Sequence, residues 1–497
     1  MKKILITLML FATFIVGKSQ SFPDFEWGEG IPSPDLSWTG EVGSQLFPEG
    51  DKFSAFDYGL KNDTMQLSTS AIQRAIDACS KAGGGIVEIP AGKYRIGAIY
   101  LKSNVNLHLH EGAVLIASEN IADYPEIRTR IAGIEMVWPS AVVNILDAEN
   151  VALTGKGIID GRGKVWWNKY WNMRKDYEKK KLRWIVDYDC KRVRGILVSN
   201  SKQVTLKNFI LMRTGFWGCQ ILYSDKCTID GITINNNIEG HGPSTDGIDI
   251  DSSTNILIEN CEIDCNDDNI CIKAGRDADG LRVNRPTMNV IVRNCVTHKG
   301  AGLITCGSET SGGIRNVLGY DLKASGTSSV CRLKSAMNRG GIVENIYMTR
   351  IKADSTRGIL VADLNWNPSY SYSKLPEEYE GKEIPEHWKV MLTPVTPEEK
   401  GYPHFRNVYL SDIEGTDVGT FISASGWNDA LRLENFYLTG IKAEVKKAGK
   451  IAYTSGFNIG NVRLKVADGG KIELRDNEDI SIDIKYTTVP LKKGIGL

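Results

Sequence analysis

The stretch of residues 244–275, STDGIDIDSSTNILIENCEIDCNDDNICIKAG, combines strand patterning with a high density of carboxylates. Six of its isoleucines alternate with polar residues: Ile248, Ile250, Ile256, Ile258, Ile270 and Ile272. This period of two predicts half-buried β-strands. Like charges crowded on a sheet repel each other, so a fold that keeps them there is expected to use them.

Five aspartates of this stretch form two groups, Asp246, Asp249 and Asp251, then Asp267 and Asp268. One turn of a parallel β-helix takes about 20 to 30 residues, so Asp246 and Asp267 are expected one turn apart on one sheet face. Neighbouring strands lie about 4.8 Å apart, which brings the carboxyl groups together and separates their pKa values. Glycoside hydrolysis uses such a pair, one carboxyl protonated and one ionised. A run of Asp-rich turns and a calcium site remain alternatives.

Three motifs make the interpretation specific. Thr245-Asp246-Gly247, Asp267-Asp268 and Arg332-Leu333-Lys334 follow one another along the chain. Together they resemble the signature of the family 28 glycoside hydrolases, the polygalacturonase family. The resemblance extends over about residues 52–350 and includes the segments AIQRAIDACSKAGGG, GRDADGL and GSETSGGIRNV.

The resemblance implies that Asp246, Asp267 and Asp268 carry catalysis by direct displacement with water and inversion at the anomeric carbon. We assign Asp267 to protonation of the departing oxygen, and Asp246 and Asp268 to activation of the water. Asp249 is assigned to substrate binding. Carboxyls on adjacent turns could have either a retaining or an inverting separation, so inversion rests on the resemblance alone.

Arg332 and Lys334 have the same parity on a strand, so both side chains are expected to point to one side. Two neighbouring cations suit the carboxylate of galacturonate, which Arg can bind through two hydrogen bonds. A solvated or ion-paired basic surface is the alternative.

The chain departs from the family pattern near these motifs. Many polygalacturonases have Gly-His-Gly where this chain has Gly300-Ala301-Gly302, and a methyl group cannot form the hydrogen bonds of a histidine. His298 and His241 are the candidate substitutes for substrate binding. Ser244 replaces the usual Asn before Thr-Asp, and Leu333 replaces Ile. Loss of the histidine also resembles the branch that cleaves rhamnogalacturonan.

We therefore expect hydrolysis of α-galacturonosyl linkages in an acidic pectic polysaccharide or oligosaccharide, with polygalacturonase or exo-galacturonidase action. A rhamnogalacturonan hydrolase is the alternative. A calcium-dependent β-helix lyase and a non-catalytic glycan-binding β-helix are two further alternatives. We expect no cofactor, and no metal because the chain has neither a CxxC pair nor a Cys/His ligand cluster.

Composition and the N-terminus limit location and partners. Lys2 and Lys3 precede an apolar segment at residues 4–16, so residues 1–20 are interpreted as a signal peptide that is too short to span a membrane. An exported, periplasmic or extracellular protein without a membrane anchor is expected. The balance of 60 basic and 60 acidic residues argues against nucleic-acid binding. A monomer is expected.

The remaining chain predicts an all-β protein, a right-handed parallel β-helix (solenoid). Residues 21–50 are interpreted as an N-terminal arm and residues 51–497 as a single catalytic β-helix domain. A helix over residues 68–83 is expected to cap its open end. Insert loops near 160–194 and 363–404 interrupt the repeat, and their aromatic residues suit either sugar binding or packing outside the helix.

The repeat has two recurring turn positions. Units begin at Asn104, Asn150, Gln203, Lys226, Asn255, Asn289, Asn316, Asn345, Asn407, Asn435 and Asn461. Several units have Asn, Asp or Gly five residues later, and these residue types tolerate left-handed backbone. Cys261 and Cys295 each follow the unit's Asn by six residues, which indicates small buried side chains stacked on successive turns and argues against a full disulfide framework.

Overall fold

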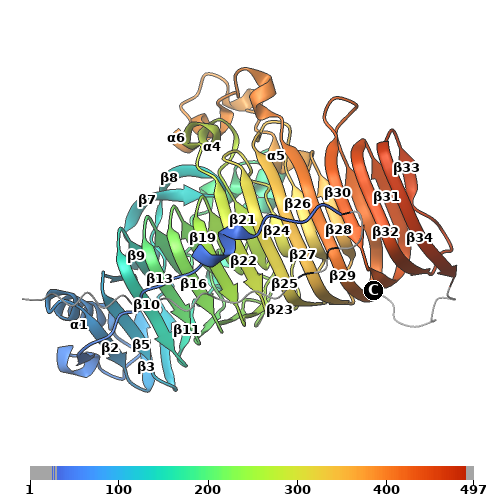
Figure 1. The fold of residues 1–497 in the computed structure, drawn as a ribbon. Coiled ribbons are helices and arrows are strands. Elements are labelled where there is room, and N and C mark those ends of the chain that lie inside the picture. The colour runs from blue at the N-terminus through green and yellow to red at the C-terminus, as the bar shows by residue number, and fades with distance from the viewer. Residues whose placement is uncertain (1–24, 26, 28–30, 489–497) are drawn as a thin grey trace, which may run out of the picture.

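The computed structural model describes residues 25, 27 and 31–488, so the predicted signal peptide at 1–20 lies outside the described residues. The strands form a parallel β-helix in which each strand pairs with the strand one turn on (Figure 1). The turns form three faces. None of the helices in the described ranges combines the length and the apolarity that a bilayer crossing requires.

The strands of each face are in parallel register. Face 1 contains β4 (Ile99–Leu101), β9 (Val143–Leu146), β12 (Ile196–Ser199), β15 (Cys219–Leu222), β18 (Ile248–Asp251), β21 (Ile270–Lys273), β24 (Gly302–Cys306), β26 (Ser329–Lys334), β28 (Gly358–Asp363), the ends of β29 (His404–Ser425) and β31 (Lys442–Ala452), and β33 (Glu473–Arg475). Face 2 contains β1 (Lys52–Ser54), β2 (Gly85–Ile89), β5 (Val105–Leu109), β10 (Glu149–Gly155), β13 (Lys202–Lys207), β16 (Asp225–Asp230), β19 (Thr254–Glu259), β22 (Thr287–Arg293), the starts of β25 (Ile314–Ser325), β27 (Ile342–Asp354) and β29, β30 (Leu433–Thr439), the start of β32 (Thr454–Val466), and β34 (Glu478–Thr488). Face 3 contains β3 (Gly92–Ile96), β6 (Ala113–Ala117), β11 (Ile158–Asp160), β14 (Ile210–Met212), β17 (Thr233–Asn235), β20 (Glu262–Asp264), β23 (Val296–Thr297), and later segments of the long strands from β25 onward.

Apolar side chains of alternate residues fill the interior between the faces. On face 1, Ile248 is in register with Ile270, and Ile250 with Ile272. All four are fully buried. Because the side-chain period is two, the intervening Asp249 and Asp251 point to the outer side of the same strand.

The predicted turn positions adopt left-handed backbone. Every unit-starting residue from Asn104 to Asn461 has positive φ, as do the second turn residues Asn208, Gly231, Asn260, Asn294, Asp321, Asp412 and Gly440. The asparagines also form a ladder along the axis. The Asn316 amide donates to Asn289 Oδ1 at 3.0 Å and accepts from the Asn345 amide at 3.1 Å. The repeated turn predicted from the sequence is confirmed.

Asn316→Ala is expected to lower the free energy of unfolding by about 2–4 kcal/mol, because alanine is strained at positive φ and both ladder hydrogen bonds are lost. Asn316→Gly is the matched control, since it accepts the backbone conformation and loses only the hydrogen bonds. Urea unfolding should rank wild type above Gly and Gly above Ala. Equal stability of the two variants would contradict a conformational role for this turn.

Helix α1 (Thr69–Lys81) caps the N-terminal end of the β-helix, as predicted (Figure 1). It buries its apolar stripe, which includes Ile72, Ala75 and Ile76, against the first turns. The last turns at the other end are β33 and β34, in agreement with the strand pattern predicted after residue 465. All ten cysteines are free and buried, so the interpretation of small core side chains is confirmed.

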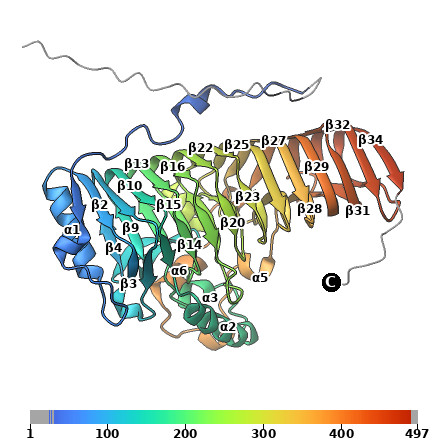
Figure 2. The same cartoon turned by 90° about the horizontal axis from the view of Figure 1, so that it is seen from below.

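The described part of the predicted arm follows the outer side of face 2 (Figure 2). The Gly43 amide donates to the Asn255 carbonyl at 2.9 Å. The Trp27 ring lies 5.8 Å from the Tyr347 ring and 6.2 Å from the Tyr409 ring. A short 3₁₀ helix, η1 (Ser37–Glu41), separates these contacts. The arm therefore covers apolar side chains of several consecutive turns.

The two inserts are partly helical, and their description as loops is corrected. The first contains α2 (Lys164–Lys179) and α3 (Val186–Asp189); the second contains α5 (Pro368–Ser371), η4 (Glu377–Tyr379), α6 (Glu386–Leu392) and η5 (Glu398–Gly401). The described elements are completed by a hairpin of β7 (Glu126–Ile131) and β8 (Ile134–Pro139), helix α4 (Asp277–Val283), and the short 3₁₀ helices η2 (Ala55–Tyr58) and η3 (Ile121–Asp123). Helices arise because Trp184 and Trp388 share an apolar cluster with Trp138 of the hairpin. Trp184 and Trp388 of the two inserts thus pack together against the hairpin.

Candidate active site

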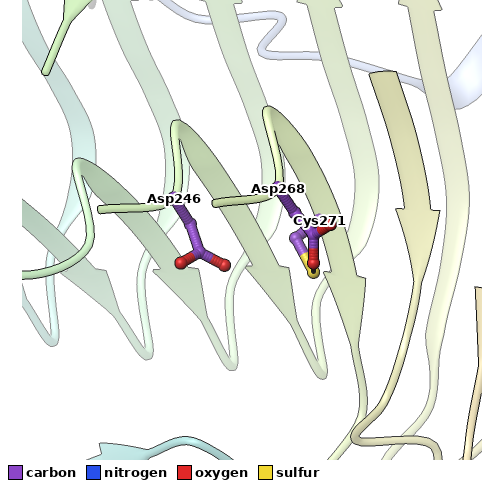
Figure 3. A group of neighbouring side chains, drawn as sticks. All are labelled: Asp246, Asp268 and Cys271. Atoms are coloured by element: carbon purple, nitrogen blue, oxygen red, sulfur yellow. Dashed lines mark hydrogen bonds between the residues drawn. The ribbon is translucent and has the colours of Figure 1, made fainter. Parts of the chain in front are cut away.

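Three carboxylates gather on the outer side of face 1. Asp246 precedes β18, and the Asp267–Asp268 pair precedes β21. Because Ile248 is in register with Ile270, Asp268 is the counterpart of Asp246 on the next turn (Figure 3). The expectation that Asp267 is this counterpart was wrong by one residue, since tight turns and not carboxylate spacing fix the length of a β-helix turn.

Asp268 is fully buried and held by two cations. Its oxygens accept from Arg332 Nη1 at 3.0 Å and from Lys334 Nζ at 2.7 Å. Thr305 Oγ1 donates a third hydrogen bond at 2.8 Å. Burial disfavours the charge, but Lys334 and Arg332 outweigh it and hold the pKa of Asp268 below its ordinary value. Asp268 is therefore ionised, and Arg332 and Lys334 do point to one side, as their parity predicts.

A buried ammonium group organises the other carboxylates. Lys273 Nζ lies 3.6 Å from Asp246 Oδ2, 3.4 Å from Asp249 Oδ1 and 3.4 Å from Glu309 Oε2. Trp217 covers it, with Nζ 5.1 Å from the ring centre. Burial opposes the charge of Glu309, but Lys273 and other cations lower its pKa to about 2. Lys273 therefore neutralises part of the negative charge that the site concentrates.

The pKa values of the carboxylates are shifted in opposite directions. Burial, then repulsion from Asp249 and Asp267, raises the pKa of Asp246 well above its ordinary value. Burial and the neighbouring Asp268 charge raise the pKa of Asp267. The pKa is therefore raised for Asp267 and lowered for the adjacent Asp268. Acid–base catalysis requires two carboxyl groups whose pKa values are separated in this way.

Asp246 and Asp267 line a pocket with about 480 Å³ of space. Asp246, Asp267, Lys273 and Lys334 form its floor. Trp366 of the second insert joins them, with its ring 4.4 Å from Lys334 Nζ and 5.7 Å from the Arg332 guanidinium. Aromatic faces and cations side by side suit a charged sugar.

The first insert also lines the pocket, through Arg183 and Asp187. Arg183 Nη1 donates to Asp187 Oδ2 at 2.7 Å, and the Ser244 hydroxyl donates to Asp187 Oδ1 at 3.0 Å. Arg183 is a further cation in the pocket that no motif identified. Its place in a basic run beside Trp184 is the signal that could have found it.

Other predicted residues lie outside the pocket lining, among them the buried Asp268 and its partner Arg332. Asp249 is fully buried beneath it at Lys273. His298 follows β23 on face 3, where its ring bonds the Glu262 carboxylate at 2.8 Å. His241 lies in the loop before β18, and its carbonyl accepts from Trp171. The structure therefore brings neither histidine to the carboxylates.

Sequence reasoning did not single out Lys273 or Glu309. Lys273 ends a strand whose other residues are Ile, Cys and Ile, and a charge in such a fully buried strand was the available signal. Glu309 lies in the GSETSGG segment, which was noted for its resemblance and given no role.

Asp246, Asp268 and Cys271 are close enough to hold a metal ion in principle, with one potential ligand atom from each within 4.8 Å of the others (Figure 3). Their chemistry does not fit this role. Burial raises the pKa of the Cys271 thiol well above its ordinary value, whereas a metal needs the thiolate. Both Asp268 oxygens already bind cations. The cluster is suited to ion pairing with ammonium and guanidinium groups.

Stability is expected to fall as the pH rises from 5 to 8. Burial raises the pKa of Asp249 from 3.8 to about 7, despite the attraction of Lys273. Between these values the folded protein retains a proton that the unfolded chain has released, so higher pH favours unfolding. Urea unfolding of Asp249→Asn, which mimics the protonated form, should show a loss about 3 kcal/mol smaller than wild type over this range. Parallel pH profiles for both proteins would contradict this protonation state.

Comparison with known proteins identifies relatives. The model of the glycosyl hydrolases family 28 matches residues 79–374. A probable polygalacturonase from Vitis vinifera is 32% identical over 63% of this chain and 61% of its own length. An exo-poly-alpha-D-galacturonosidase from Dickeya chrysanthemi is 30% identical over 65% of this chain and 59% of its own length. The match thus spans about three fifths of each relative.

Solved structures agree on the fold. A hyperthermoactive exopolygalacturonase from Thermotoga maritima is 24% identical, covers 88% of this chain and 94% of its own, and has a TM-score of 0.62. A family 28 exopolygalacturonase from Yersinia enterocolitica is 21% identical, covers 88% of this chain and 79% of its own, and has a TM-score of 0.63. The right-handed parallel β-helix predicted from the sequence is confirmed. With its family model matched across residues 79–374, this chain belongs to the glycosyl hydrolases family 28.

Proposed function

We propose that this protein hydrolyses α-galacturonosyl linkages in pectic polysaccharide or its oligosaccharides. The observation that carries the proposal is the pairing of Asp267, which lines the pocket and has a raised pKa, with the ionised Asp268, which is buried next to it and held by Lys334. The galacturonan-cleaving relatives named above support the choice of sugar.

The proposed reaction is a single displacement. Asp267 gives its proton to the glycosidic oxygen as the bond from that oxygen to the anomeric carbon breaks. A water molecule attacks the anomeric carbon from the opposite side, and ionised Asp268 accepts its proton while Asp246 orients it. The products are a new reducing end and a shortened chain. Asp267 then regains a proton from solvent and Asp268 releases one.

In this proposal, the cations of the site bind the negatively charged carboxylate of the substrate. Lys334 and Arg332 reach the carboxylate of a bound galacturonate while they hold Asp268 ionised. Arg183, which also lines the pocket, offers a further cation, and Trp366 offers a surface for the sugar ring. Asp249 lies beneath the pocket and holds Lys273 in place through their ion pair. His241 and His298 have no part in this proposal, because their contacts are with Trp171 and Glu262 and not with the catalytic carboxylates.

We also propose that the protein is an exported monomer in the periplasm or outside the cell. The basic and apolar residues at 1–20 support export. Residues 51–497 are proposed to act as one catalytic domain, because the pocket combines residues of face 1 with both inserts.

To test the proposal, the purified protein is incubated without calcium with polygalacturonate, with its short oligomers and with rhamnogalacturonan backbone. The products are identified by mass. Saturated products from polygalacturonate are expected, and monomer alone would mean attack at chain ends. Cleavage confined to the rhamnose-containing chain would favour the second candidate, which Ala301 suggests. Unsaturated products would indicate a lyase. If none of the substrates yields a product, a non-catalytic glycan-binding protein would be the remaining interpretation.

A further inference from the structure

Face 1 continues past the pocket into a second hollow that the reaction does not use. This hollow, here called the distal groove, has about 980 Å³ of space. Four basic residues line it, Arg357, Lys447, Lys450 and Lys471, against two acidic ones, Asp468 and Glu473. All four basic side chains are exposed. The groove therefore has an excess of positive charge on the face that carries the catalytic site.

These four basic side chains form no ion pairs within the described residues. Within residues 31–488, none of the four lies within 4.0 Å of a carboxylate oxygen as an ion pair, whereas neighbouring Lys446 pairs with Asp417 at 3.7 Å. Lys471 lies against the Tyr486 ring, 6.0 Å from its centre. Asp468 accepts a hydrogen bond from the Gly470 amide in its own turn. The four positive charges are thus available to an anionic ligand.

Strand register connects the distal groove to the pocket. Arg332 is in register with Val361, Val361 with Ser423, and Ser423 with Lys450. Val361 and Ser423 line the groove together with Lys450. Three strand spacings place Lys450 about 14 Å from Arg332 along the axis. At this register position Val361 and Ser423 are the two residues between Arg332 and Lys450.

A hollow on face 3 provides the contrast. It is lined by three basic residues, Lys323, Arg350 and Lys352, and three acidic ones, Asp321, Asp412 and Glu414. Arg350 binds Asp321 through two hydrogen bonds of 2.7 Å. A balanced and paired hollow has no excess charge for an anionic chain. The excess on face 1 is therefore not a general property of hollows on this β-helix.

We propose that the distal groove binds the continuation of an acidic polysaccharide whose scissile bond lies in the pocket. The proposal rests on the proposed function. An acidic chain carries one carboxylate per uronic acid, so its charges can meet Lys450 and Lys447 while another sugar occupies the site at Arg332. The groove then raises affinity for long chains and has no effect on chains too short to reach it.

The test compares kcat/KM for a galacturonate trimer and for chains of more than ten sugars. The groove variant is Lys447→Gln, Lys450→Gln and Lys471→Gln combined. The matched control is Lys323→Gln, Lys352→Gln and Lys442→Gln combined, which removes the same charge from face 3. At low salt we expect the KM of the groove variant to rise about tenfold for long chains and less than twofold for the trimer. The control should match wild type on both substrates.

Salt provides a second readout, because exposed charge contacts are screened. In 0.5 M NaCl the difference between wild type and the groove variant should nearly disappear. An unchanged KM for long chains in the groove variant, or an equal rise in the control, would overturn the inference while trimer hydrolysis upheld the proposed function. Failure of wild type to hydrolyse either substrate would overturn both.

Discussion

Asp267→Asn is expected to lower kcat on oligogalacturonates by about 10³-fold and to leave the fold unchanged. Asparagine keeps the size of the side chain but has no proton of suitable acidity for the departing oxygen. The carboxyl is suited to this task because burial and the Asp268 charge raise its pKa, and because it lines the pocket. Initial rates with a trimer, together with circular dichroism of the variant, measure both parts of the expectation.

An activated substrate distinguishes proton donation from a structural role of Asp267. A nitrophenyl galacturonide releases a leaving group that needs no protonation, so Asp267→Asn should lose less than about tenfold with it. Asp264→Asn is the control, since this carboxylate lies outside the pocket lining and accepts a hydrogen bond from Asn237. An equal loss on both substrates would show that Asp267 is not the acid.

Lys273→Met is expected to cost about 3–5 kcal/mol of folding free energy, because it removes the cation shared by Asp246, Asp249 and Glu309. Methionine fills most of the volume, so the loss reflects uncompensated charge and not a cavity. The largest cost falls on Glu309, whose low pKa depends on Lys273. Urea unfolding at pH 7 measures this cost.

A second substitution tests this explanation of the Lys273 effect. Adding Glu309→Gln to Lys273→Met should recover part of the lost stability, since the carboxylate left without its cation is neutralised. Lys352→Met, an exposed change on face 3, should stay within about 0.5 kcal/mol of wild type. A Lys273→Met protein as stable as wild type would contradict the view that Lys273 holds the carboxylates together.

The repeat could be predicted because its physical cause is local. A residue such as Asn255 or Asn289 predicts a left-handed turn, and the alternation of apolar and polar residues predicts the strand that follows. The cysteines were predictable for the same reason, since a repeated register implies a repeated environment. The helices of the two inserts were missed, because their apolar residues pack against a hairpin distant in the sequence and follow no repeat.

The site was only partly predictable. Asp246, Asp267 and Asp268 lie in motifs, and the parity of Arg332 and Lys334 was sufficient to orient their side chains. Lys273, Glu309 and Arg183 could not be placed, because their contacts join separate turns and an insert. His241 and His298 show the reverse error, since proximity in sequence to a motif did not bring either to the pocket.

Proton NMR during hydrolysis of trigalacturonate tests the central claim most directly. Single displacement by water on an α-linkage predicts that the β-anomer of the new reducing end appears first and later equilibrates with the α-anomer. No vinyl proton signal should form. An α-anomer that appears first would contradict the single displacement by water, and a vinyl signal would contradict hydrolysis itself.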